Sequence, residues 1–260
     1  MALLAARSNR VGRVSISIAP LLCLVAVACS APAPATPAAE KPAAPTSSAA
    51  DAGQSKPNRL FLPQDLGLIE APDRAEWWKP ELIMDELTIA EGDKVADLGA
   101  GGGWFTIHLA RRVGPNGRVY AEDIQPLMID ALSRRVRREG FTNVETVVGT
   151  ATDPKLPAGS LDAVLIADAY HEMNEPARPE VILTLLGNIA RSLKPQGRLG
   201  VVAFLPGGGG PGPALEERVD PDSVTTTMTA AGLTLEKREV VPPFLYLLVF
   251  GKSTARADSR

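Results

Sequence analysis

The stretch Val95-Ala96-Asp97-Leu98-Gly99-Ala100-Gly101-Gly102-Gly103-Trp104-Phe105 decides the fold of this 260-residue chain. Its apolar start predicts a strand, its glycines predict a turn, and the periodic apolar residues that follow predict a helix. A glycine turn lets the backbone approach a ligand that any Cβ would repel, and the helix N-terminus behind it offers free N–H groups. The pattern therefore predicts a nucleotide-like cofactor; the alternative is a turn that binds nothing.

The spacing of the glycines narrows the choice of cofactor. A dinucleotide fingerprint reads G-x-G-x-x-G, but Trp104 stands where its third glycine would be, which disfavours a nicotinamide-dependent reductase. The observed G-x-G-x-G turn, preceded by an aspartate, resembles the first motif of class I S-adenosylmethionine-dependent methyltransferases. The resemblance implies S-adenosylmethionine as the cofactor, with a site that includes Asp97, Gly99, Gly101 and Gly103.

The composition is that of an ordinary globular protein, with 45% hydrophobic and 22% charged residues and a net charge of −3. This charge predicts no nucleic-acid partner, and the basic run at 134–138 is typical of a solvated helix face, with nucleic-acid or membrane contact as the alternative. Both cysteines, Cys23 and Cys29, precede the predicted domain, so we expect no disulfide or cysteine nucleophile in it. Zinc and calcium motifs are missing from the sequence, which predicts no metal.

Residues 1–28 have the pattern of a lipoprotein signal peptide. A basic start precedes the apolar, uncharged run 14–28, which is shorter than the ~20 residues of a membrane-spanning helix. The small residues that end this run predict that Cys29 is lipidated and becomes the first residue of the mature protein. We therefore expect a membrane-anchored lipoprotein that faces the periplasm or the cell exterior; an uncleaved anchor and a wrongly assigned start are the alternatives.

The rest of the chain divides into three parts. Residues 29–57, rich in alanine and proline, predict a disordered tether, and residues 252–260 predict a disordered tail. In 58–251, strands alternate with helices, which predicts an α/β domain with a mostly parallel sheet and helices on both faces. The expected helices span 72–87 (broken at Pro80), 104–113, 126–139, 176–193 and 220–231, and the expected strands span 94–98, 118–122, 143–148, 161–167, 198–204, 233–240 and 244–250.

The connection between the last two strands fixes their direction. Pro242-Pro243 alone joins them, and so short a link cannot carry a right-handed crossover, which predicts an antiparallel pair. The resemblance implies the same arrangement for 58–251, a Rossmann-like methyltransferase fold with a seven-stranded, mostly parallel sheet and one antiparallel strand.

Ligands of such sheets bind at the carboxyl ends of the strands. A carboxylate about 20 residues after the glycines can accept both hydroxyls of a ribose. Glu122 and Asp123 are both candidates, and the family pattern V-x-A-x-D-I favours Asp123, with Ile124 beside the adenine. Many relatives carry an adenine-binding acid at the position of Thr150, so Asp153 is either its substitute or a loop cap.

The segment 168–173, just after the fourth expected strand, lies where relatives place substrate-facing residues. It lacks the Asn/Asp-Pro-Pro-Tyr motif of nucleic-acid amino methylases and resembles small-molecule methyltransferases, with Asp168 assigned to the cofactor set. His171 is the candidate general base, because the pKa of imidazole lies near neutrality; a histidine bonded within a helix start is the alternative. Glu172 would either orient this ring or lie in the first turn of a helix, where acidic residues are favoured. His108 is predicted to be structural.

Two further segments are candidates for covering the site. The residues 77–80 predict an aromatic lid, with packing against the sheet as the alternative for Trp77. The glycine-rich loop 205–213 predicts a mobile gate or a bare linker. The favoured function is methyl transfer to a small molecule. Because the cofactor is made in the cytosol, export favours the alternative of an exported, non-catalytic binding module with the same fold.

Overall fold

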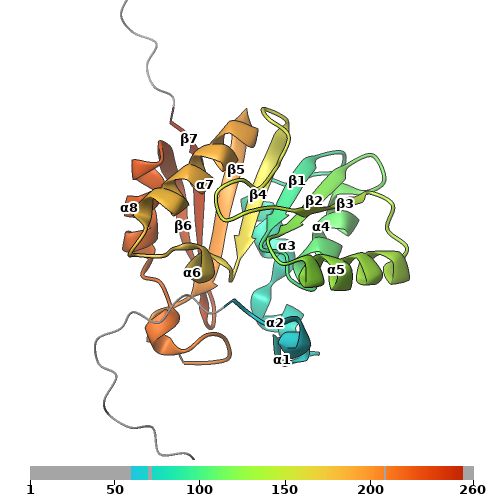
Figure 1. The fold of residues 1–260 in the computed structure, drawn as a ribbon, viewed down its shortest axis with the longest axis horizontal. Helices are drawn as coiled ribbons and strands as arrows, with labels where there is room; N and C mark the ends of the chain where they lie inside the picture. The colour runs from blue at the N-terminus through green and yellow to red at the C-terminus, as the bar shows by residue number, and fades with distance from the viewer. Residues whose placement is uncertain (1–59, 70–71, 208, 254–260) are drawn as a thin grey trace, which may run out of the picture. The chain divides into compact units, whose positions relative to one another are not determined.

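The computed structural model describes residues 60–69, 72–207 and 209–253 (Figure 1). The predicted signal peptide, lipidated Cys29, tether and most of the predicted tail lie outside these ranges, so these features stay predictions. The contacts separate residues 1–52 from 53–260, and every described residue belongs to the second unit. In the described ranges, every helix falls short of the length and apolarity needed to cross a membrane.

The described residues form one seven-stranded sheet in the order β3-β2-β1-β4-β5-β7-β6. Its strands are β1 (Lys94–Leu98), β2 (Arg118–Asp123), β3 (Val144–Val148), β4 (Leu161–Ala167), β5 (Leu193–Phe204), β6 (Leu233–Val241) and β7 (Leu245–Lys252). The helices are α1 (Leu66–Ile69), α2 (Arg74–Trp78), α3 (Pro80–Glu86), α4 (Trp104–Val113), α5 (Pro126–Glu139), α6 (Tyr170–Met173), α7 (Pro179–Ser192) and α8 (Pro221–Ala230). Short 3-10 turns, η1 and η2, span Pro63–Asp65 and Leu215–Glu217.

The direction of the strands confirms the predicted fold. The pairs from β3 to β5 are parallel, whereas β7 runs antiparallel to both β5 and β6, as the short Pro242-Pro243 link predicts. In the parallel register Leu98 faces Glu122 on one side and Ile166 on the other, so the carboxyl ends of β1, β2 and β4 meet at one edge. Strands β2 and β3 follow β1 on one side of the sheet, and β4 and β5 lie on its other side. The strand order therefore reverses between β1 and β4, and this topological switch point lies at the same edge.

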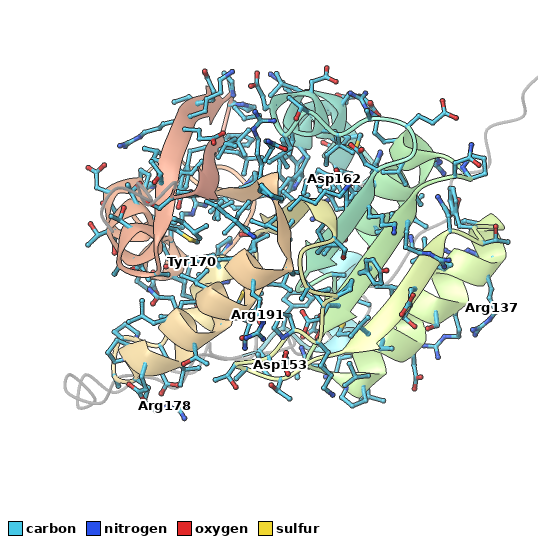
Figure 2. The ribbon with its side chains drawn as sticks, turned by 90° about the horizontal axis from the view of Figure 1, so that it is seen from above. Arg137, Asp153, Asp162, Tyr170, Arg178 and Arg191 are labelled. Carbon is cyan, nitrogen blue, oxygen red and sulfur yellow. The ribbon has the colours of Figure 1, made fainter. Side chains whose placement is uncertain are left out.

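Alternation along the strands buries both faces of the sheet. On one face Leu98 and Ile166 pack with α7 through Leu186. On the other face Val95 and Leu165 pack with the apolar residues of α3 and α4. The solvated outer face of α5 appears in Figure 2, where Arg137 lies at the periphery, as the basic run predicts.

Two boundaries differ from the expectation. Helix α7 begins at Pro179 rather than near 176, because the separate short helix α6 and a connection precede it. Strand β5 begins at Leu193, and a register shift after the Leu161–Leu193 pair absorbs residues 194–197, whose turn chemistry predicted a helix end. Elsewhere α2 and α3 are separate helices on either side of Lys79, as the predicted break at Pro80 requires.

Asp220→Ala is expected to lower the free energy of unfolding by about 1 kcal/mol. The Asp220 carboxylate accepts hydrogen bonds from the backbone N–H groups of Asp222 (3.1 Å) and Ser223 (3.2 Å), which caps α8. Urea unfolding measures the loss. Thr226→Ala is the control, because that exposed side chain lies on the same helix and leaves the cap intact. Equal stabilities of the two variants would show that the cap contributes nothing.

Candidate functional site

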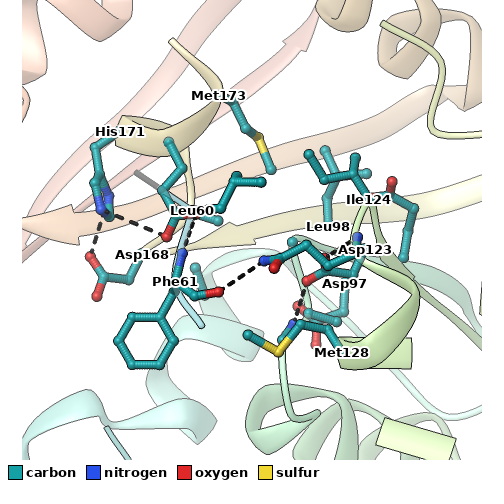
Figure 3. A pocket seen from close by; sticks show the side chains of 18 of the residues that line it. Leu60, Phe61, Asp97, Leu98, Asp123, Ile124, Met128, Asp168, His171 and Met173 are labelled. Atoms are coloured by element: carbon teal, nitrogen blue, oxygen red, sulfur yellow. Dashed lines mark hydrogen bonds and ion pairs between the residues drawn. The ribbon is translucent and has the colours of Figure 1, made fainter. Parts of the chain in front are cut away.

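A cavity of about 790 Å³ lies at the sheet edge where β1, β2 and β4 end, within the usual size range of small-molecule sites. Figure 3 shows Asp97 and Asp123 on one side of it and Asp168 and His171 on the other. The structure thereby brings together residues that the sequence predicted separately: Asp97, Gly99, Gly101, Asp123, Ile124, Asp168 and His171 all line the cavity.

The glycine turn lines one side of the cavity. Gly99 and Gly101 have φ angles of +69° and +53°, a region that favours glycine. A Cβ on Gly99 would lie 2.6 Å from the Cβ of Ala169, so the turn contacts the start of α6 directly. Gly103 is the N-cap of α4 and packs on Leu132, where a Cβ would come within 3.0 Å of Cγ. Gly103 therefore shapes the turn but does not line the cavity.

Asp97 links the glycine turn to helix α4 through a hydrogen bond. Its buried carboxylate accepts a hydrogen bond from the hydroxyl of Thr106 on α4 at 2.6 Å. Burial raises the pKa of Asp97 to about 6, although the bond from Thr106 opposes the rise. Arg135 of the basic run also contacts the turn, since its Nη1 donates to the carbonyl of Gly102 at 3.3 Å.

Both candidate ribose acids border the cavity at the end of β2. The Asp123 carboxylate accepts N–H bonds from Gly101 (3.0 Å) and Gln125 (2.8 Å), which fix its orientation. A carboxylate has about four lone-pair sites, so Asp123 can still accept from a hydroxyl donor. The Glu122 carboxyl is 3% exposed and occupies the space that a Cβ on Gly149 would need. Burial is the main reason that the pKa of Glu122 rises to about 8, and the charge of Asp123 adds to the rise.

Glu122→Gln is expected to flatten the dependence of stability on pH. The folded protein holds the Glu122 proton up to about pH 8, whereas the unfolded chain releases it near the ordinary value of 4.5. Stability contributed by this group is therefore complete below about pH 4.5 and is lost as the pH rises towards 8. Because one pKa unit corresponds to about 1.4 kcal/mol, the variant should gain a few kcal/mol relative to the parent between pH 5 and pH 8.5.

Urea unfolding across that pH range measures the difference. Glu145→Gln removes an exposed carboxylate on the neighbouring strand β3 and should keep the parental slope. A parental slope in Glu122→Gln would contradict the assignment of a buried, protonated carboxyl.

Asp168 stands in an unusual conformation at the end of β4. Its φ angle is +55°, which is uncommon for a residue other than glycine and typical of functional sites. Its Oδ1 atom is buried and makes no hydrogen bond within the described ranges. Burial raises the pKa of Asp168 to about 7, and the nearby charge of Arg74 limits the rise. A buried acceptor without a donor is costly, so this atom is aimed at a group that a ligand would bring.

His171, on α6, lies between the carboxylates of Asp168 and Glu172. Its Nδ1 atom is 3.9 Å from Oδ1 of Asp168 and its Nε2 atom is 4.0 Å from Oε1 of Glu172 (Figure 3). Burial lowers the pKa of His171 below the ordinary 6.5, and the charge of Glu217 opposes this. The ring is therefore neutral at pH 7 and can accept a proton from a group in the cavity.

A segment that the sequence did not single out covers the cavity. The N–H of Phe61 donates to Oε2 of Glu172 at 3.2 Å, and its carbonyl accepts from Nε2 of Gln125 at 3.0 Å. Phe61 thus bridges α6 and the end of β2, and Leu60, Leu62 and Leu66 line the cavity around it. These residues follow a proline-rich stretch and form turns too short for a periodic signal.

The aromatic segment 77–80 does not line the cavity. Trp77 packs against the core, with its ring on those of Phe204 and Phe244, which is the packing alternative. Trp78 is buried, and its ring packs edge-on against Phe105 and Phe204. Arg74, in the same helix α2, does line the cavity: it is buried and its guanidinium lies 4.4 Å above the ring of Trp104. An arginine close to aromatic residues is the only sequence signal for this contact, and it does not by itself predict a cavity residue.

Hydrogen bonds from a neighbouring arginine hold the glycine-rich loop 205–213 in place. The guanidinium of Arg218 donates hydrogen bonds to four of its carbonyls, those of Leu205, Gly209, Pro211 and Pro213. Two loop glycines lie directly on aromatic rings, Gly210 on Phe244 and Gly212 on Phe204. Gly212 and Pro213 line the cavity, so the loop forms part of its wall.

The loop after β3 contains Thr150 and Asp153, the two positions considered for a contact with adenine, and only one of them lines the cavity. Thr150 lines the cavity, whereas Asp153 does not. The Asp153 carboxylate accepts the N–H of Lys155 at 2.9 Å, and its carbonyl accepts the N–H of Thr150. Asp153 therefore caps this loop, and a contact with adenine stays a prediction. His108 also lies outside the cavity, with its ring 4.6 Å from that of Trp104.

Comparison with known proteins agrees with this geometry. Residues 95–197 match a family described as a methyltransferase domain. Nocamycin O-methyltransferase of Saccharothrix syringae is 31% identical over 50% of this chain and 45% of its own length. An uncharacterized methyltransferase of Mycobacterium tuberculosis is 38% identical over 48% of this chain and 45% of its own length. The chain thus spans about half the length of these curated relatives.

A solved structure extends the likeness to the whole described domain. The crystal structure of a SAM dependent methyltransferase from Aquifex aeolicus superposes with a TM-score of 0.68 at 27% identity. The match covers 74% of this chain and 98% of that chain.

Proposed function

We propose, from the premise that this chain belongs to the class I S-adenosylmethionine-dependent methyltransferases, that its cavity transfers a methyl group to a small-molecule acceptor. One observation carries the proposal. A single cavity joins the glycine turn and Asp123 on one side to His171 and its flanking carboxylates on the other. This arrangement supports a cofactor site and a proton acceptor within one cavity.

The residues of the first side fit S-adenosylmethionine, which is the cofactor. The backbone of Gly99 and Gly101 can approach its amino-acid part, because both residues have positive φ angles and carry no Cβ. At Gly99 a Cβ would also clash with Ala169. The oriented carboxylate of Asp123 can accept the ribose hydroxyls. Ile124 and Met128 supply apolar surface for the adenine. When bound, S-adenosylmethionine supplies an activated methyl group on a sulfonium.

The chain itself supplies alignment, exclusion of water and a base. The carbonyl and N–H of Phe61 connect the two sides of the cavity, and the leucines beside it keep water from the reacting atoms. His171 accepts the proton that an acceptor must lose, and Asp168 and Glu172 flank the ring on either side.

Calorimetry and turnover test the proposal on the purified full chain. We expect S-adenosylmethionine and S-adenosylhomocysteine to bind in the micromolar range, about −8 kcal/mol. Methyl-labelled S-adenosylmethionine, incubated with a pool of small alcohols, thiols and amines, should pass its label to one class. Absence of binding would contradict the proposal. Binding without transfer to any acceptor would instead support the exported binding module.

We also propose that Cys29 anchors the chain to a membrane. The basic start, the short apolar run and the small residues before the cysteine support this. Cys29→Ser should release the protein from the membrane fraction of its host, whereas Cys23→Ser should not. Release of both variants, or of neither, would contradict a lipid anchor at Cys29.

A further inference from the structure

The cavity wall is rich in carboxyl groups. Within the described residues, they outnumber the arginines of the wall several-fold: the acids are Asp65, Asp97, Glu122, Asp123, Asp168, Glu172, Glu175 and Glu217, and the arginines are Arg74 and Arg178. Glu122 keeps its proton near neutral pH, because its pKa is raised to about 8, so the surplus of negative charge comes from the other acids. The cofactor side holds Asp97, Glu122 and Asp123. The acids that surround His171 therefore remain for the acceptor.

The arginines of this wall already have partners. Arg178 donates through Nε and Nη2 to the carboxylate of Glu175, so this pair is neutral as a whole. Arg74 is buried over the rings of Trp78 and Trp104 and acts electrostatically on Asp97 and Asp168. An acceptor with a carboxylate or phosphate would thus meet a surplus of like charge, which disfavours binding.

The acids near His171 are placed to accept hydrogen bonds. The Oδ1 atom of Asp168 is buried and lacks a donor within the described ranges. Glu172 lies on the other side of the ring, and Glu217 reaches the cavity from the turn η2. A donor that carries positive charge would satisfy Asp168 and offset the surplus charge in one step, because charge-assisted hydrogen bonds are stronger than neutral ones.

The remaining wall of the acceptor side is apolar. Phe61, Met173, Val181 and Pro213 line it, and none of them can bond a polar group through its side chain. Such a wall fits a hydrocarbon or aromatic skeleton. The acceptor should therefore have an apolar body and one basic head.

We propose that the acceptor of this site is an apolar amine, bound by its ammonium group to Asp168 and Glu172 and methylated on nitrogen. This inference rests on the proposed function. The ammonium gives one proton to the imidazole of His171, which leaves a neutral amine with a lone pair. The nitrogen then forms a bond to the methyl carbon while the carbon–sulfur bond breaks, and its electron pair stays on sulfur. The products are the methylated ammonium and S-adenosylhomocysteine.

Binding to the full chain saturated with S-adenosylhomocysteine tests the proposal without turnover. The probes are matched sets with one skeleton: phenethylamine, 2-phenylethanol and 3-phenylpropanoate, and tryptamine with its alcohol and acid counterparts. We expect each amine to bind at least about tenfold more tightly than its alcohol, and the acids to bind most weakly. Equal binding of amine and alcohol, tighter binding of an acid, or absent binding of every amine would overturn the proposal.

Substitutions show which carboxylates cause the preference for amines. Asp168→Asn and Glu172→Gln should each remove most of the preference for the amine while the affinity for S-adenosylhomocysteine stays within about threefold. Glu216→Gln is the matched control, because this exposed carboxylate next to Glu217 lies outside the cavity. If Asp168→Asn instead weakens the binding of S-adenosylhomocysteine and keeps the amine preference, Asp168 serves the cofactor and the proposal is overturned.

The two proposals fail in different ways. If S-adenosylhomocysteine does not bind, the proposed function fails and this inference fails with it. If S-adenosylhomocysteine binds but the amines have no advantage, only the acceptor class is refuted.

Discussion

Replacing His171 by asparagine is expected to lower the rate of methyl transfer by about 10²- to 10⁴-fold, the usual contribution of a general base. Asparagine cannot take a proton at neutral pH but preserves a polar side chain of similar size. The affinity for S-adenosylmethionine should stay within about threefold, because His171 lies on the far side of the cavity from Asp123 (Figure 3). Release of S-adenosylhomocysteine at saturating cofactor measures the rate.

The chain offers a matched control for this variant. His108 is the other histidine of the sequence, and it lies outside the cavity on α4. His108→Asn should therefore keep the rate within a few-fold of the parent. If His171→Asn retains more than about a tenth of the parental rate, the chemistry does not need this base.

The pH profile supplies a second readout of His171. Burial lowers the pKa of His171, so the ring stays neutral to a pH below the ordinary 6.5. The groups that face it are Asp168, Glu172 and Glu217. We expect protonation of His171 to lower the parental rate at a pH below 6.5, and this fall should be missing in His171→Asn.

Asp123→Ala is expected to weaken the binding of S-adenosylmethionine by about 10- to 100-fold, or 1–3 kcal/mol, the cost of leaving buried donors without an acceptor. The carboxylate also holds Gly101 and Gln125 in place, so its removal loosens the turn as well as the ribose contact. Calorimetry on the full chain measures the change, with the thermal midpoint as a check on folding.

Glu122→Gln serves as the matched comparison for the choice between the two acids. Glu122 lies one residue earlier, is buried against Gly149, and has a raised pKa that keeps it protonated near neutral pH. Glutamine mimics that protonated form, so the affinity should stay within about threefold. A large loss in Glu122→Gln with a small loss in Asp123→Ala would show that Glu122 holds the ribose.

Local signals were enough to predict the fold and several residues that line the cavity. The glycine turn, the antiparallel pair joined by Pro242-Pro243 and the cap at Asp220 each depend on a few adjacent residues, and the structure confirms all three. A helix start at His171 was one of the alternatives, but the bounds of the short helix α6 and the early start of β5 were not predicted. A single turn has no periodicity, and pairing with Leu161 overrides local turn chemistry.

The cover of the cavity depends on contacts between distant residues. Phe61 bonds to Glu172, 111 positions along the chain, and to Gln125, 64 positions along the chain. Arg218 fixes the loop 205–213 through carbonyls, which carry no side-chain signal in the sequence. Arg74 reaches the cavity because it stacks on Trp104, 30 positions later. No pattern of neighbouring residues encodes such contacts, so sequence reasoning predicted the residues at the strand ends but not the segments that cover the cavity.

A crystal structure of the full chain grown with S-adenosylhomocysteine would show whether the glycine turn and Asp123 hold the cofactor. We predict density for the amino-acid part against the backbone of Gly99 and Gly101, and for both ribose hydroxyls within hydrogen-bond distance of the Asp123 carboxylate. Density for the nucleoside at another place on the chain, or a turn that closes against Asp123 and leaves no space for a ribose, would contradict it.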